Sequence, residues 1–206
     1  MIRDKLTSRN LFIRILWLSL IFLITFFGVT VLSYYILPEG LLKSANTSRD
    51  FTISSDIRLA GIQIFLFNMM SVAVIAISSL FARKNGESKA YLSIGYSCFL
   101  VLVLINAVTL GTWSFITDVP SVGLVERITS MFRITEHAGL TEMFGQLLIT
   151  CALADKHIFM IYKKQTIKRR IKDVPWKKEE IFCILLGFAL MFIGAWVESR
   201  ALINIG

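Results

Sequence analysis

Long apolar runs alternate with short polar connectors along the chain, and this alternation predicts most of its architecture. Five runs are predicted to be membrane-spanning helices. They cover residues 11–37, 59–82, 91–116, 140–162 and 181–205. A helix needs about 20 apolar residues to cross the hydrocarbon core of a bilayer. We therefore expect an all-α fold, a polytopic membrane helical bundle with five transmembrane helices in a single integral membrane domain over residues 1–206.

The fourth run is the least apolar of the five, and the basic residues bear on whether it crosses the membrane. Cytoplasmic loops carry an excess of Lys and Arg. With five crossings most basic residues fall on one side, whereas with four they divide more evenly. We therefore expect five crossings of the cell membrane, with the N-terminus cytoplasmic and the C-terminus outside. Asp155, Lys156 and His157, near the cytoplasmic end of this run, are expected to snorkel to the interface.

A short amphipathic pattern occupies the connector between the third and fourth runs. The apolar residues Val125, Ile128, Met131 and Phe132 recur at helical spacing, opposite Glu126, Arg127, Ser130 and Arg133. This pattern predicts a short interfacial helix near 122–135. A surface loop packed on the bundle is the alternative.

Composition and charge fit a membrane protein. The chain is 55% hydrophobic and 17% charged, with a formal net charge of +8. This positive charge is explained by basic cytoplasmic loops, so we expect the lipid bilayer as a partner and no nucleic acid. The three cysteines each fall inside an apolar run without metal-like spacing, and they predict packing residues rather than a disulfide framework.

Polar side chains from separate runs, whose burial in lipid is energetically unfavourable, are predicted to meet in the outer half of the bilayer. The candidate polar cluster consists of Asn68, Asn106, His137, Glu142 and Glu198. A carboxylate in hydrocarbon costs roughly 2.5–3.5 kcal/mol or more, so it requires a partner or a water-filled cleft. Gly187 and Gly194 share a helix face with Glu198 and allow close helix approach. Binding and helix packing are both open as roles for this cluster.

Residues 163–180 form a strongly basic connector that is predicted to be cytoplasmic. Its candidate basic residues are Lys163, Lys164, Lys168, Arg169, Arg170 and Lys172. Attraction to anionic lipid and the setting of topology are one interpretation. Docking of a separate ATPase subunit is the other.

Catalytic motifs are absent from the sequence. It has no His-Glu-x-x-His, no Gly-x-x-x-x-Gly-Lys-[Ser/Thr] and no Gly-x-Ser-x-Gly. These motifs mark zinc hydrolases, nucleotide-binding loops and serine nucleophiles. We therefore expect no catalytic residue, metal site or cofactor, and no enzyme activity.

Four short segments occur in an order that resembles a known family. They are Ile64-Phe65-Leu66-Phe67-Asn68, Ile105-Asn106-Ala107-Val108-Thr109-Leu110-Gly111, His137-Ala138-Gly139-Leu140-Thr141-Glu142 and Gly194-Ala195-Trp196-Val197-Glu198. Over roughly residues 55–206 the chain resembles the stage II sporulation protein M family of bacterial and archaeal integral membrane proteins. It departs from that family's pattern at Ala107, which replaces a glycine, and at Ala138-Gly139, which adds a residue before Glu142.

The resemblance implies a non-enzymatic subunit of a membrane complex, associated with other membrane proteins or with copies of itself. Two alternatives stay open. One is a permease-like subunit of an ABC-type export or bacteriocin immunity system, served by a separate ATPase subunit. The other is an intramembrane enzyme.

Overall fold

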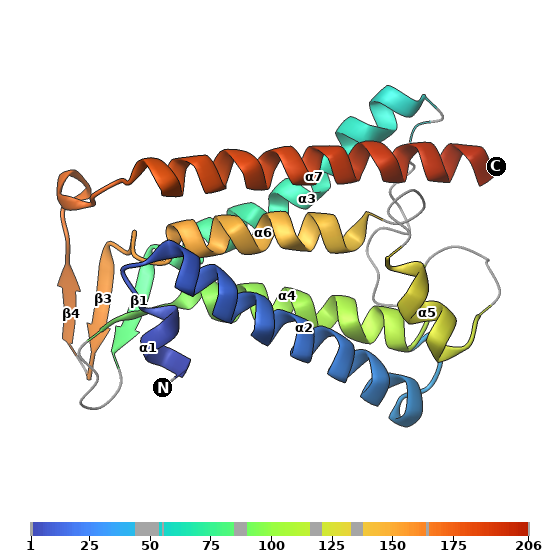
Figure 1. The fold of residues 1–206 in the computed structure, drawn as a ribbon, viewed down its shortest axis with the longest axis horizontal. Coiled ribbons are helices and arrows are strands. Elements are labelled where there is room, and N and C mark those ends of the chain that lie inside the picture. Colours follow the sequence, from blue (N-terminus) through green and yellow to red (C-terminus); the bar gives the residue numbers. More distant parts are fainter. Residues whose placement is uncertain are drawn as a thin grey trace.

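The computed structural model describes residues 2–43, 54, 56–84, 90–115, 121–132, 138–163 and 165–205, with side chains up to Ala201 in the last range. Most of these residues are helical (Figure 1). The helices are α1 (Ile2–Leu6), α2 (Leu11–Ile36), α3 (Ile57–Ser79), α4 (Ile94–Gly111), α5 (Leu124–Ser130), α6 (Gly139–Leu153) and α7 (Lys178–Ile205), and a 3-10 turn covers Ile171–Asp173.

Polar side chains fix where three of the long helices begin. The Asn10 side chain accepts a hydrogen bond from Phe12 N at the start of α2. Asp56 accepts from the backbone of Arg58 and Leu59 at the start of α3, and Ser93 likewise caps α4. Such N-caps satisfy backbone donors that have no partner within the helix. The sequence therefore encodes these helix starts locally.

The long helices alternate in direction along the bundle. Thr30 of α2 donates to Ala107 O of α4, and Phe22 of α2 contacts Phe99 of α4, so these two helices run the same way. Helix α7 also begins at the end where α2 begins, because Arg14 pairs with Glu180 there. Helices α3 and α6 run in the opposite direction.

Helix α6 lies at the centre of the bundle. Figure 1 shows it between α7 and the pair formed by α2 and α4. Ten of its 15 residues are buried. The main apolar core, which includes Phe26, Phe99 and Leu147, surrounds it on one side. Ile149 and Met191 form part of a second core toward α3 and α7.

Four helices in the described ranges are long and apolar enough to cross a membrane: α2, α3, α4 and α7. By the length and apolar composition of these helices, the prediction of a mostly helical, multi-pass membrane protein is confirmed. Helix α6 has 15 residues, which is about 22 Å at 1.5 Å per residue, against about 30 Å for the hydrocarbon core. It ends at Leu153 rather than near residue 162, so a fifth span stays a prediction.

A small sheet at one end of the bundle was not predicted, and the all-α prediction is wrong in this respect. The strands are β1 (Phe81–Lys84), β2 (Leu92–Ser93), β3 (Phe159–Tyr162) and β4 (Gln165–Lys168), in the order β2-β1-β3-β4. Strands β1 and β3 pair in parallel, and the other neighbours are antiparallel. The apolar residues of β1 directly continue the run that forms α3, and those of β3 end the predicted run 140–162, so both sequences resemble helix ends.

The predicted short helix near 122–135 is present as α5, at the end of the bundle opposite the sheet (Figure 1). Its faces differ from the expected ones. Arg127, expected on the polar outer face, is only 5% exposed, whereas Val125 is 75% exposed. The reason is a set of hydrogen bonds that hold the Arg127 guanidinium inside. Residues 133–135 of the prediction lie outside the described residues.

Candidate functional site

Three of the five predicted cluster residues come together from three different helices. Asn68 lies on α3, Glu142 in the first turn of α6 and Glu198 near the end of α7. The Glu142 carboxylate interacts with the Asn68 amide and with the negative charge of Glu198. Glu142 is 7% exposed, and Asn68 and Glu198 are half-buried. We call these three residues the acidic cluster.

The contact between Asn68 and Glu142 is a close approach rather than a well-aligned hydrogen bond. Asn68 Nδ2 and Glu142 Oε1 are both buried, and neither has a hydrogen-bond partner among the described residues. The two side chains are nevertheless near enough for the amide to act electrostatically on the carboxylate. Because hydrogen bonds require good alignment, the donor and the acceptor here retain unused bonding capacity.

Glycines allow α6 and α7 to approach closely enough to form this cluster. A Cβ atom added at Gly194 would lie 2.5 Å from Glu142 Cγ. Farther along the same helix pair, a Cβ at Gly145 would lie 2.6 Å from the Gly187 carbonyl oxygen. No side chain fits at such distances. The close packing expected at Gly187 and Gly194 is therefore present, and it presses Glu142 against α7.

Asn106 does not join the acidic cluster. It is exposed on α4, and its Nδ2 donates to Leu102 O of its own helix over 2.9 Å. Its neighbour Ala107 is fully buried and accepts a hydrogen bond from Thr30. Adjacent residues point about 100° apart on a helix, so packing Ala107 against α2 turns Asn106 outward. His137 lies outside the described residues, and its predicted place stays untested.

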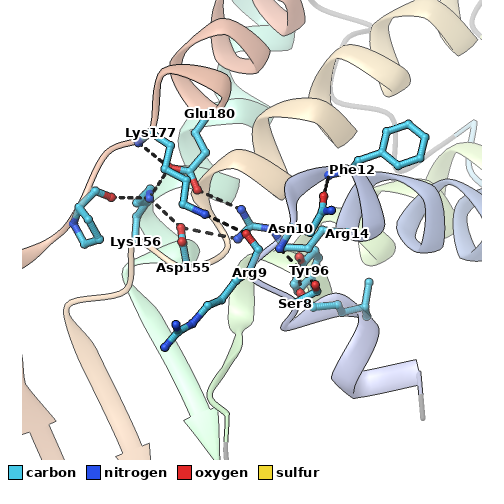
Figure 2. A network of polar contacts seen from close by, with 12 residues as sticks. Ser8, Arg9, Asn10, Phe12, Arg14, Tyr96, Asp155, Lys156, Lys177 and Glu180 are labelled. Atoms are coloured by element: carbon cyan, nitrogen blue, oxygen red, sulfur yellow. Dashed lines mark hydrogen bonds and ion pairs between the residues drawn. The ribbon is translucent and has the colours of Figure 1, made fainter.

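A second cluster of ionised side chains, which was not predicted, lies at the opposite end of the bundle, near the sheet (Figure 2). It joins the start of α2, the segment after α6 and the start of α7. Arg14 Nη2 lies 3.0 Å from Glu180 Oε1 and Arg14 Nη1 lies 3.6 Å from Asp155 Oδ1. Lys156 Nζ lies 2.6 Å from Glu180 Oε2 and 2.8 Å from Asp155 Oδ1. We call these four residues the ionic cluster.

The ionic cluster balances two cations against two anions in a largely buried space. Arg14, Lys156 and Glu180 are 1%, 4% and 0% exposed, respectively. Lys156 also donates to Pro175 O over 2.6 Å, and Lys177 N donates to Glu180 Oε2 over 3.0 Å. Buried charges need such partners to offset the loss of hydration. The cluster thus ties three distant segments of the chain together.

Snorkelling was the wrong prediction for Lys156, because α6 ends before it and the chain turns it inward. Burial raises the pKa of the neighbouring Asp155 carboxyl, but the hydrogen bond and charge of Lys156 and the charge of Arg14 outweigh burial and hold that pKa below its ordinary value. Burial lowers the pKa of His157. The one sequence signal for this site was Arg14, which is the only charged residue in the run 11–37.

The predicted basic connector includes the turn between β3 and β4, strand β4 and the 3-10 turn, and it ends in the first turn of α7. Most of its basic side chains are exposed, and Arg169 is half-buried and donates to Asp173 O. Lys163 Nζ lies 5.5 Å from the centroid of the Tyr162 ring, and Lys84 Nζ from β1 lies 4.9 Å from the same centroid. Arg170 and Lys172 are exposed. Lys164 lies outside the described residues.

No family model, curated protein or solved structure matches this chain. Within the part of the chain that the structure describes, no group of three or more His, Cys, Asp or Glu side chains could hold a metal ion.

Proposed function

We propose that the chain is a non-enzymatic subunit of a membrane protein complex, similar in role to the stage II sporulation protein M family. The observation that carries this proposal is the incomplete burial of the acidic cluster. Glu142 is buried, but Asn68 and Glu198 remain half-buried on helices that are long and apolar enough to span the membrane. Polar groups that face lipid at this depth are costly.

A helix from another protein, or from a second copy of the chain, would remove that cost by covering the α3–α7 edge. Large apolar side chains of α3 and α7 are exposed, including Leu66, Met70 and Ile193. The side chains of Asn68 and Glu198 are only half-buried, so they can still form hydrogen bonds across such a contact. Interhelical hydrogen bonds of this kind contribute about 0.6 kcal/mol each, so the cluster adds specificity to a contact that is mainly apolar.

A second candidate function is a permease-like subunit with a separate ATPase. The exposed basic side chains of the β3–β4 hairpin and its following turn favour this alternative, because they offer a charged surface at one end of the bundle. The exposed candidate residues are Lys163, Lys168, Arg170 and Lys172. Co-purification of a nucleotide-binding protein with the native chain, lost on reversing these four charges, would favour this function over the first.

Site-directed cross-linking in native membranes tests the first proposal. Ile64 is half-buried on α3, one helical turn before Asn68 and on the same helix face, whereas Ile24 is 73% exposed on α2. We expect I64C, treated with a thiol cross-linker, to give a species of higher mass. The matched control I24C should give little. Equal yields at both positions, or no product at Ile64, would contradict a partner on the α3–α7 edge.

Substitution of the two glutamates then separates a functional site from a packing site. E142Q and E198Q keep the side-chain size and remove the charge. If I64C cross-linking persists in both variants while any export or resistance phenotype is lost, the carboxylates act in function. If only the amount of protein falls, they act in packing.

A further inference from the structure

A cavity of about 450 Å³ lies at the end of the bundle opposite the sheet, apart from both clusters. It is open to the surface and is bordered by the ends of α2 and α4 and by the residues that lead into α5. Its lining includes Tyr34, Glu39, Thr112, Ser121 and Arg127. We call it the Arg127 cavity.

Arg127 is a buried cation that is held rigidly at the wall of this cavity. It is 5% exposed. Its Nε donates to Val122 O over 2.7 Å and its Nη1 donates to Gly111 O over 2.5 Å. The rings of Tyr34 and Trp113 lie 4.9 and 5.1 Å from the guanidinium carbon. The backbone and aromatic contacts fix its position, so the guanidinium is preorganised to bind an anion.

The only anionic partner of Arg127 among the described residues is Glu39, which is exposed and replaceable. Arg127 Nη2 lies 3.0 Å from Glu39 Oε1, and the Glu39 side chain is 54% exposed. Because more than half of the Glu39 side chain is exposed, water can hydrate its carboxylate when it leaves Arg127. The Glu39 carboxylate can therefore turn into solvent when another anion enters, whereas the backbone carbonyl partners of Arg127 cannot leave.

The position of the cavity indicates which anion would reach it. The candidate spans α2 and α4 end beside it, at Ile36 and Gly111, which is the depth of lipid headgroups. The adjacent α5 exposes Val125, and the turn after it exposes Phe132. Trp and Tyr side chains, as found here around Arg127, are enriched at this interface. Arginine binds phosphate through paired, charge-assisted hydrogen bonds.

We propose that the Arg127 cavity binds the phosphate of an anionic phospholipid, which displaces the Glu39 carboxylate from Arg127. This proposal is independent of the membrane-complex function. A net negative headgroup is favoured because displacement of Glu39 leaves one uncompensated positive charge in the cavity. The proposal predicts that substitutions of Glu39 and of Arg127 change the affinity for the lipid in opposite directions.

Native mass spectrometry of the full chain released from detergent can measure lipid binding directly. Phosphatidylglycerol and phosphatidylcholine would be titrated separately. We expect E39Q to bind phosphatidylglycerol at least about threefold more tightly, because the internal competitor is weakened. R127Q should bind it roughly tenfold to a hundredfold more weakly, as expected for the loss of a charge-assisted hydrogen bond.

The control variant is E126Q, which removes the same charge from an exposed position on α5, one residue before Arg127 and outside the cavity lining. It should leave the affinity unchanged. If R127Q fails to fold, the affinity of E39Q for phosphatidylglycerol still tests the proposal. The proposal is overturned if E39Q and E126Q behave alike, or if both lipids bind equally well. It is also overturned if soluble glycerol 3-phosphate binds as tightly as the lipid, which would make a free phosphate the ligand.

Discussion

Glu180 is the residue on which the ionic cluster depends most. It is fully buried at the start of α7 and accepts contacts from Arg14, Lys156 and the backbone of Lys177. In E180Q the charge is lost while the shape is kept. Among the described residues, Asp155 would then be the one remaining anionic partner of Arg14 and Lys156, and one of the two buried positive charges would have no counter-charge.

The expected cost follows from this imbalance. Removing one member of a buried ion pair destabilises a protein by about 3–5 kcal/mol. The lower end applies here, because Asp155 is 38% exposed and still pairs with both cations. A loss of about 3 kcal/mol corresponds to a fall in the unfolding midpoint of roughly 6–12 °C for a chain of this size.

Thermal unfolding of the detergent-solubilised protein can measure this fall. The matched control is E179Q, which makes the same change at the preceding residue of α7, where the side chain is exposed. We expect a midpoint shift of no more than about 1–2 °C in E179Q. Equal midpoints for E180Q and E179Q would contradict a stabilising role for the ionic cluster. The double variant R14Q/E180Q should lose less than the sum of its single variants, since the two residues interact directly.

Two further predictions concern the helix pair α6–α7 and the response to acid. G194A should destabilise the protein by about 1–3 kcal/mol in the same thermal assay, because its Cβ would lie 2.5 Å from Glu142 Cγ. The control is G28A, where no atom lies within 4 Å of the added Cβ. It should leave the stability unchanged or raise it slightly. The pKa of Asp155 lies below its ordinary value of 3.8 in the folded protein, so the stability that it contributes is present above that value and is lost as the pH falls through the folded-state pKa. Unfolding midpoints measured from pH 6 to pH 3 should therefore fall less in D155N than in the native chain, and parallel curves would count against this linkage.

Helical periodicity in the sequence was enough to predict part of the acidic cluster. Glu142 and Glu198 follow from the expected inward faces of α6 and α7, where glycines mark close packing. Asn68 also joins them. Asn106 was misplaced because burial of the small Ala107 against α2 decides the rotation of α4, and an alanine carries little signal in a hydrophobic run.

The ionic cluster and the sheet could not be predicted from local patterns. The partners of Arg14 lie 141 and 166 residues away, and no spacing rule connects such positions. The strands have two to four residues each, so alternation of polar and apolar positions has too little length to be recognised. Phe81 and Phe159, which stack across the sheet, appear in the sequence as the ends of membrane helices.

The parallel pairing of β1 with β3 joins the ends of α3 and α6 that lie nearest the sheet. Because side chains alternate between the two sides of a strand, a shift of one residue in this pairing would turn Phe81 and Phe159 away from each other. Lengthwise sliding of α3 against α6 is therefore blocked at that end. Any opening of the bundle must pivot about the sheet, so that its largest displacement occurs at the far end, around α5.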